Sequence, residues 1–454
     1  MKSIFLKLLS ISIPILLISF PQFSSSTDPS RPDDDEAPGI PSMVAAAMLC
    51  FLAASISSAG GIGGGGLFIP VLTIVAGFDL TTASALSAFM VAGGSVANVA
   101  CCFIRKFAAA GGRGAGGRGT RGGIDFDIAL MSEPMMLLGV SVGVIWNVVF
   151  PEWLITVMFV GFLVWSTLKT CRNGMKLWNL ETEQRSCGGE LGTGDDKSGG
   201  GGGEEGGRQP LLVTGEKNGG GGFPWIKLGV LVVVWISFSS LYLLRGNRHG
   251  EGLIEVKPCG FEYWALSSLQ IPLAILFTAW ILLRSKTHEH EHHQPTNDDE
   301  NLQVSARISR AATNRIIFPI MALLAGILGG VFGIGGGMLI SPLLLQVGIA
   351  AEVTAATCSF MVFFSSSMSA FQYLLLGMEH INTAIILSAT CFVASLLGLL
   401  VVHRAIEKYG RASLIVFSVA IVMALSTVLM TSYGALQVWR DYQAGNYMGF
   451  KPPC

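Results

Sequence analysis

The sequence predicts an all-α polytopic membrane protein made of two inverted-topology helical repeats, each with a glycine-broken, re-entrant helix. Composition is the first reason. Of 454 residues, 51% are hydrophobic and only 13% charged, whereas soluble domains carry roughly 25% charged residues. The apolar residues are also gathered in runs of about 20, the length that crosses a hydrocarbon layer of about 30 Å. The third reason is a glycine-rich segment that occurs twice. These features argue against a water-soluble enzyme.

A series of apolar runs gives the expected membrane spans. Two shorter apolar pieces, 67–77 and 338–348, each follow a glycine run and are too short to cross the bilayer as helices. We therefore expect half-helices or re-entrant segments there. The longer runs lie at residues 40–59, 82–104, 128–150, 153–168, 224–244, 261–283, 316–333, 354–376, 381–402 and 412–436.

The segments outside the spans divide the chain into regions. Lys2 and Lys7 flank an apolar N-terminal stretch, which is the layout of a signal peptide or of an uncleaved signal anchor. Such a segment leads to the plasma membrane or to a membrane of the secretory pathway. The expected regions are 1–23, the signal segment; 24–39, a lumenal or extracellular segment; 40–168, the first membrane repeat; 169–222, a glycine-rich disordered cytosolic linker; 224–283, two connecting transmembrane helices; 284–315, a histidine-rich cytosolic linker; 316–437, the second membrane repeat; and 438–454, a C-terminal tail.

Basic residues in the short loops indicate the orientation. Arg105, Lys106 and Arg113 follow the second span, and cytoplasmic loops are enriched in Lys and Arg. If each short apolar piece returns the chain to the side it came from, both linkers also lie in the cytosol. The span before the first glycine run then points inward and the span before the second points outward. The two halves are therefore expected to be inverted relative to each other.

An internal repeat supports this arrangement. A shift of 272 positions aligns 61–70 with 333–342 without a gap. The same shift pairs Thr82 with Thr354 and Ser87 with Ser359. Glycine-rich low complexity does not by itself place a proline and a Thr-Ala-x-x-x-Ser pattern in register, so we interpret the repeat as a duplication.

The duplicated glycine runs predict a binding site at the middle of the membrane. Broken backbone is tolerated in a bilayer only where it is buried in protein or lines a cavity, and secondary transporters bind substrate at such breaks. A half-helix N-terminus offers free N–H groups to an anion, and Ser or Thr hydroxyls can donate from the facing span. Both prolines are expected in the first turn of a half-helix. The predicted substrate-binding residues are Gly61, Gly63, Gly64, Gly65, Pro70, Thr82, Ser87, Gly333, Gly335, Gly336, Gly337, Pro342, Thr354 and Ser359.

These residues also have structural interpretations. Glycine runs can serve only close helix packing, as we expect for Gly139-x-x-x-Gly143 and Gly326-x-x-x-Gly330. Hydroxyl groups in membrane helices often bond their own backbone. Three carboxylates are candidates to carry a coupled proton, although such residues often lie at the membrane interface: Asp79, Glu133 and Glu352.

At these residues the sequence resembles the sulfite exporter TauE/SafE family, and its linkers and signal-like N-terminus are similar to those of plant members. The resemblance rests on 61–70 with 82–87 and on 326–342 with 354–359, and it covers 40–170 and 315–437. It implies a secondary transporter, not an enzyme, that exports sulfite, organosulfonates or related small anions. The two half-sites differ chemically, because Ser84 corresponds to Ala356 and Gly66 to Met338.

Competing functions find weaker support in the sequence. The run 288–292 formally matches a zinc-protease pattern but lies in a polar segment, where weak metal binding is the most that we expect. A divalent-metal transporter stays an alternative, as does a non-transporting receptor or scaffold. We expect no cofactor, no resident metal, and no nucleic-acid partner, since 29 basic residues balance 30 acidic ones. The partners are a small anion and the lipid bilayer, and the oligomeric state is left open.

Overall fold

The computed structural model is helical throughout the part of the chain that it describes. No strand occurs among the described residues. Eight of the described helices are long and apolar enough to cross a membrane, and shorter apolar helices occur at Pro41–Ser57, Gly65–Ile74 and Ile317–Phe332. The described residues are 40–61, 64–111, 123–189, 225–245, 260–290, 301–347, 349–378, 380–409, 413–444 and 449.

The helices follow the order of the apolar runs. Their apolar sequences favour helices, because backbone groups inside a bilayer must be satisfied within each segment. The elements are α2 Ile40–Ser57, the 3₁₀ turn η1 Ser58–Gly60, α3 Gly65–Ile74, α4 Leu80–Gly111, α5 Phe126–Val149, α6 Glu152–Gly189, α7 Trp225–Arg245, α8 Phe261–Ser268, α9 Gln270–His290, α10 Asn301–Phe332, α11 Gly337–Val347, α12 Ala351–Leu375, α13 Ile381–Tyr409 and α14 Ser413–Ala444.

The helices reach further into both expected linkers than hydropathy indicates. Helix α6 continues to Gly189, α9 continues to His290, and α10 begins at Asn301. The disorder expected from residue 169 is not found up to residue 189, and the expected linker start at 284 falls inside α9. The reason is that Glu, Gln, Lys and Arg are good helix formers, so a helix need not end where its apolar stretch ends. The expected segments 1–23 and 24–39 lie outside the described residues.

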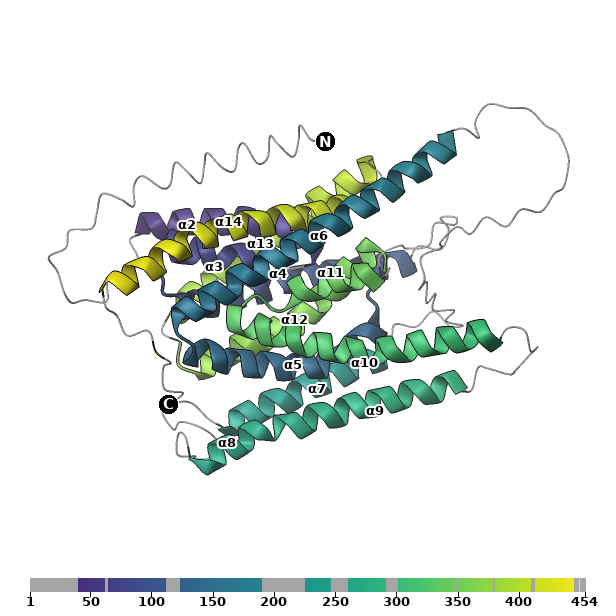
Figure 1. The fold of residues 1–454 in the computed structure, drawn as a ribbon, viewed down its shortest axis with the longest axis horizontal. Coiled ribbons are helices and arrows are strands. Elements are labelled where there is room, and N and C mark those ends of the chain that lie inside the picture. Colours follow the sequence, from purple (N-terminus) through teal and green to yellow (C-terminus); the bar gives the residue numbers. More distant parts are fainter. Residues whose placement is uncertain are drawn as a thin grey trace, which may run out of the picture.

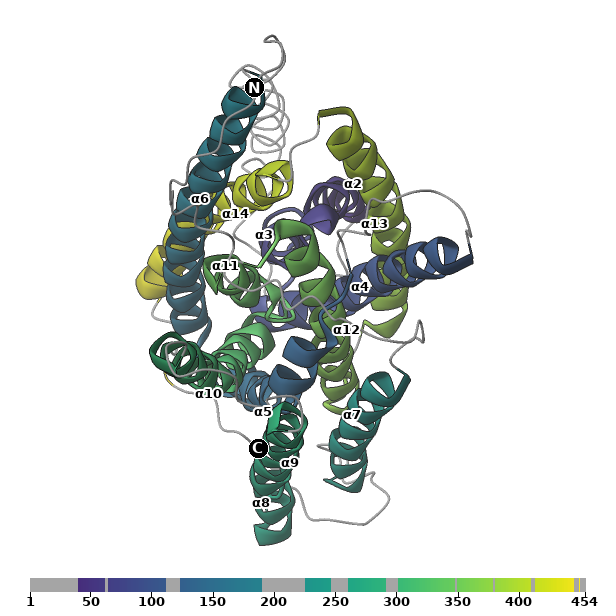
Figure 2. The same cartoon turned by 90° about the vertical axis from the view of Figure 1, so that its right-hand side faces the viewer.

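The two halves of the chain contact each other in reciprocal pairs. Helix α5 packs on α10 just as α13 packs on α2, and α12 packs on α5 just as α4 packs on α13. The short helix α3 contacts α14, and α11 contacts α6. Helices α4 and α12 pack on each other, as do α6 and α14. The connecting helices α7 and α9 lie along one side of this core, against α5 (Figures 1 and 2).

Glycines bring α5 and α10 into close contact. A Cβ at Gly139 would lie 2.3 Å from the Leu323 carbonyl oxygen, and one at Gly326 would lie 2.2 Å from the Met136 carbonyl oxygen. Gly143 and Gly330 meet in the same way one turn along. The expected packing role of these two GxxxG pairs is confirmed, because only glycine permits backbones to approach so closely.

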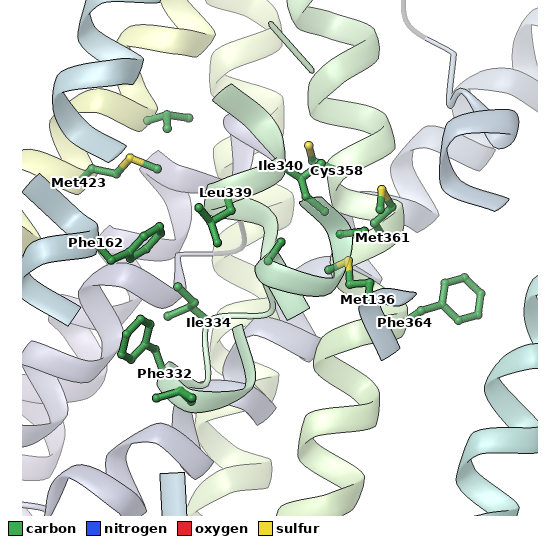
Figure 3. Close-up of a cluster of buried hydrophobic side chains, with 14 of the residues drawn as sticks. Met136, Phe162, Phe332, Ile334, Leu339, Ile340, Cys358, Met361, Phe364 and Met423 are labelled. Carbon is green, nitrogen blue, oxygen red and sulfur yellow. The ribbon is translucent and has the colours of Figure 1, made fainter. Parts of the chain in front are cut away.

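An apolar cluster surrounds the second glycine turn. Figure 3 shows Phe162 and Phe332 on one side of Ile334, and Met136 and Met361 on the other. All except Phe162, which is 7% exposed, are 1% exposed or less. Residues from α5, α6, α10, α11, α12 and α14 contribute to the cluster. The glycine turn is thus held in packed protein and is not exposed to lipid.

Candidate functional site

The first glycine turn joins α2 to the buried half-helix α3. Gly61 and Gly64 have positive φ angles of 72° and 81°, which glycine adopts without a steric cost. Gly64 is the N-cap of α3, and the Leu67 N–H bonds its carbonyl at 3.0 Å. From Gly65 to Thr73 every residue of α3 is buried. Gly63 lies outside the described residues.

The second glycine turn joins α10 to the half-helix α11 in a similar way. Gly333, Gly335 and Gly336 have φ angles of 61°, 68° and 69°. The Leu339 N–H bonds the Gly336 carbonyl at 3.2 Å, and Gly336 corresponds to Gly64 by the shift that aligns the repeats. Gly337 opens α11. The duplicated sequence thus forms a duplicated backbone feature, a left-handed turn that starts a short buried helix.

Each glycine turn lies against the helix that follows the other turn. A Cβ at Gly61 would lie 2.1 Å from the carbonyl oxygen of Ala355 in α12. A Cβ at Gly333 would lie 2.0 Å from the carbonyl oxygen of Ser84 in α4. The Ser87 hydroxyl donates to the Gly333 carbonyl at 2.9 Å. The structure thereby brings together Gly61 and Ser359 as one group, and Gly333 and Ser87 as another.

The side-chain space of these glycines is occupied by neighbouring protein. Gly65 faces the Ile334 backbone, Gly335 faces Val91 and Val362, and Gly336 faces the Ala325 carbonyl. The missing side chains therefore permit the approach of other helices, which is the structural interpretation of glycine runs given above.

The expected position of the two prolines is wrong. Pro70 and Pro342 lie inside α3 and α11, beyond the first turn. A proline at position 70 cannot donate to the carbonyl of Gly66, one helical turn earlier. That carbonyl instead accepts a hydrogen bond from the Ser426 hydroxyl of α14. Pro70 therefore frees a backbone carbonyl for contact with a neighbouring helix.

A small, partly open hollow lies beside the first glycine turn. Thr354 lines it and is 1% exposed, and its hydroxyl has no hydrogen-bond partner among the described residues. An unpaired buried hydroxyl costs about 1–3 kcal/mol, so this group is available for a polar ligand. The full lining is Gly60, Thr170, Ser341, Leu345, Thr354, Ala355, Ile415, Val416 and Val419.

Two polar residues of the hollow, Thr170 and Ser341, are not among the predicted substrate-binding residues. Ser341 follows the second glycine turn on α11 and hydrogen-bonds Cys358. Thr170 lies on α6, beyond the expected end of that span at 168, and contacts the Met423 sulfur at 3.8 Å. The nearby Asn173 donates to the Pro342 carbonyl at 3.3 Å. Thr170 could not be assigned to the site from the sequence, because hydropathy ends this span at 168 whereas α6 continues as a helix.

Asp79 and Glu352 occupy helix starts. The Asp79 carboxylate accepts from the Thr82 N–H at 3.0 Å, and its carbonyl accepts from the Ala83 N–H. Asp79 thus caps α4. Glu352 lies in the first turn of α12 and is partly exposed. Thr82 is likewise partly exposed, unlike its counterpart Thr354.

Glu133 differs from the other two carboxylates because it is fully buried. It is 0% exposed, and neither carboxyl oxygen has a partner among the described residues. Helices α5 and α12 run in register, since the Asp125 N–H donates to Thr357 and the Gln372 amide donates to Ser141. This register sets Glu133 level with Ser365, whose hydroxyl donates to the Gly335 carbonyl at 2.8 Å. Glu133 therefore lies at the depth of the second glycine turn.

Asp125 caps the same helix just outside the span. Its carboxylate accepts from the N–H groups of Asp127 and Ile128. Burial raises the pKa of the Asp125 carboxyl, although the hydrogen bond from Ile128 acts in the opposite direction. At this same end Asp127 forms an ion pair with Lys227 of α7 at 2.9 Å.

The described residues show no group of three or more His, Cys, Asp or Glu side chains that could hold a metal ion. Helix α9 includes His288 and His290 in its last turn.

Comparisons with known proteins identify relatives over most of the chain. A family model described as sulfite exporter TauE/SafE matches residues 1–170 and 264–429. Sulfite exporter TauE/SafE family protein 2 of Arabidopsis thaliana is 58% identical over 416 residues, which are 91% of this chain and 88% of the relative. Family protein 5 of the same plant is 57% identical over 412 residues, 91% and 87% of the two chains. No solved structure matches.

Proposed function

The chain belongs to the sulfite exporter TauE/SafE family of membrane transporters, and we propose that it exports small sulfur-containing anions by alternating access. Sulfite, an organosulfonate or a related oxyanion is the expected cargo. The observation that carries the proposal is the reciprocal seating of the two glycine turns. Gly61 lies on Ala355 of α12 and Gly333 lies on Ser84 of α4, so a movement of one half shifts the broken helix of the other.

The chemistry of the site suits a small oxyanion. No Lys or Arg occurs within 40–104, 128–168 or 316–402, so salt bridges from these spans do not hold the substrate. The helix N-termini of α3 and α11 offer partial positive charge near the membrane centre, and the Thr354 hydroxyl supplies an unused donor. Weak recognition by dipoles and hydroxyls permits release as well as binding.

Inverted repeats give a physical route to alternating access. If the two halves are related by a pseudo-two-fold axis in the membrane plane, exchanging their conformations opens the site to the opposite face. The reciprocal pairs α5 with α10 and α2 with α13 are of the kind that such an axis generates. We propose that one half rocks against the other around the crossing of α4 and α12.

Glu133 is the candidate that we retain for proton coupling. A charged carboxylate without a partner is costly at membrane depth, and such residues mark proton pathways. Gly143 lies against the Ile327 carbonyl and Gly398 against the equivalent Ser55 carbonyl, so these two glycines correspond. The same correspondence pairs Glu133 with Ser388, so only one half carries the carboxyl. Asp79 is used as a helix cap, which favours Glu133 over it.

The proposal is tested by uptake of labelled sulfite, thiosulfate and sulfate into proteoliposomes that hold the purified full chain. We expect saturable uptake of at least one anion, and stimulation by a pH gradient. In Glu133→Gln the gradient should no longer stimulate uptake, because an amide cannot take up a proton. The matched control is Glu183→Gln, which changes an exposed carboxylate on the extension of α6. Uptake of none of the three anions by the wild type would contradict the sulfur-anion proposal.

A further inference from the structure

The hollow lined by Thr354 has a partly polar lining and lies towards one face of the membrane core. Its polar lining comes from Thr170, Ser341 and Thr354, and Gly60 leaves room at its edge. The alignment of the repeats allows each lining residue to be compared with its counterpart in the other half. Two equal half-sites would carry similar residues at both places.

Two of the counterparts around the glycine turns are larger and apolar. The shift that places Gly61 on Gly333 also places Gly60 on Phe332 and Ser341 on Ile69. Thr354 matches Thr82 and Leu345 matches Thr73. The smallest residue at the edge of the hollow is thus matched by an aromatic ring in the other half.

Helices α6 and α14 provide the rest of the comparison. Thr167 and Thr427 meet across their interface at 3.3 Å, and a serine precedes each of them. A helix pair on a two-fold axis meets through equivalent residues, so we take these threonines as counterparts. Thr170 then corresponds to Met430, and Val419 corresponds to Phe159.

These counterparts fill the matching place completely. The Phe332 and Phe159 rings lie 4.7 Å apart between centroids, and Phe162 stacks on Phe332 at 6.0 Å. Phe332, Phe159 and Ile69 are each 1% exposed. They belong to one apolar cluster together with Met430 and Ile155. Where one half has a hollow, the other has close-packed rings.

We propose that the hollow holds the oxyanion on the face of the basic loops, and that Phe332 closes the corresponding subsite towards the opposite face. This inference rests on the proposed transport function and adds the residues and the direction of access. Thr354 and Ser341 donate hydroxyl hydrogen bonds to the anion, and Thr170 borders its path. Passage to the other face requires Phe332 to move away from its ring contacts with Phe159 and Phe162.

Access is tested first with a readout that needs no transport. Ser341→Cys and Ile69→Cys are made separately in the full chain, and sealed vesicles of known orientation are treated with a small membrane-impermeant methanethiosulfonate. Mass spectrometry locates the label and separates it from native cysteines such as Cys358. We expect labelling of Ser341→Cys from the basic-loop face only, with protection by the transported anion. Ile69→Cys should be unlabelled from either face.

The gate is tested by adding Phe332→Ala to Ile69→Cys. We expect labelling from the face opposite the basic loops. Phe364→Ala is the matched control, since Phe364 belongs to the same buried cluster but not to the closed subsite. Equal labelling in the control would assign the effect to a loosened core and overturn the gate. If Phe332→Ala does not fold, Phe332→Leu replaces it with a smaller loss of volume and the same expected direction.

Binding in the hollow is tested by kinetics. Thr354→Val removes the hydroxyl at nearly constant shape, and the loss of one hydrogen bond to a charged ligand should raise the KM roughly tenfold. Thr390→Val is the control, because the Thr390 hydroxyl bonds only the Ile386 carbonyl of its own helix, α13, and we expect it to leave KM within about twofold of the wild type. An unchanged KM in Thr354→Val would overturn the subsite. Failure of the proposed function differs from this, because the wild type itself would then carry none of the anions.

Discussion

At each glycine turn a side chain donates a hydrogen bond to a carbonyl at the end of the preceding helix, and the two repeats use different residues for this contact. Asn98 of α4 donates to the Ser58 carbonyl at 3.4 Å, and Tyr373 of α12 donates to the Gly330 carbonyl at 3.1 Å. Ser58 and Gly330 correspond in the repeat. The last carbonyls of a helix have no partner within it, and here each accepts both the N–H of Gly61 or Gly333 in the glycine turn and a side chain from the following span.

At the residue scale we predict that Ser87→Ala destabilises the protein by about 1–3 kcal/mol, because it removes a donor to a buried carbonyl. The Ser87 hydroxyl bonds the Gly333 carbonyl at 2.9 Å, across the two halves. Thermal unfolding in detergent measures the change. The control is Ser84→Ala, whose hydroxyl is equally buried but bonds only Leu80 of its own helix. Equal losses in both variants would contradict a special role for Ser87.

The residues that could be predicted from the sequence are those with a periodic or duplicated signal. The repeat indicated Gly61, Gly333 and Ser87, and the structure places each at a contact between the halves. The polar lining from Thr170 and Ser341 could not be predicted, because neither has a polar counterpart in the other repeat. The helix ends of α6, α9 and α10 could not be predicted either, because hydropathy marks where the apolar run ends and a helix can continue beyond it.

At the scale of elements, close packing decides which helices move together. The α5 and α10 pair is joined by opposed glycines, and in the reciprocal pair Gly398 of α13 lies against the Ser55 carbonyl of α2. Gly143 lies in the same way against the Ile327 carbonyl, and Ile327 corresponds to Ser55 in the repeat. Each half therefore has one helix, α5 or α13, that packs closely on the glycine-broken helix of the other half.

A matched pair of glycine variants tests this coupling. Gly143→Ala should lower the free energy of unfolding by about 1–3 kcal/mol through overpacking, because its Cβ would lie 2.2 Å from the Ile327 carbonyl oxygen. Gly161→Ala on α6 has nothing within 4 Å of the added Cβ. There the helix should be stabilised by about 0.5–1 kcal/mol. Denaturant unfolding of both variants in the same detergent gives the comparison, and destabilisation of both would contradict the packing argument.

The extension of α6 adds a second kind of contact between halves. Glu181 accepts hydrogen bonds from the Ser413 N–H at 3.0 Å and from the Ser413 hydroxyl at 2.6 Å. It thereby caps α14, whose first four N–H groups lack intrahelical partners. Trp178 and Phe417 pack edge to face beside this cap. The segment beyond the expected span thus belongs to the folded core and not to the linker.

At the scale of the whole molecule, equivalent helices run in opposite directions. In Figure 1, α2 begins and α14 ends towards the left, whereas α6 and α9 end and α10 begins towards the right. The C-terminal part of α4, which carries Arg105 and Lys106, lies beside the start of α12, since Phe103 contacts Phe360. By the positive-inside tendency we expect that side to face the cytosol. The hollow lies towards the same side, between the start of α12 and the start of α14.

This orientation predicts opposite accessibility for two tags in one chain. An epitope inserted in the linker 190–224 should be removed by protease added to the cytosolic face of intact vesicles. An epitope placed after residue 454 should be protected there and become sensitive only when the membrane is permeabilised. The physical reason is that α14 begins at the basic face and crosses the bilayer away from it, whereas its counterpart α6 crosses towards that face. Cleavage of both tags from the cytosolic face would contradict the inverted arrangement, and with it the assignment of the hollow to the cytosolic side.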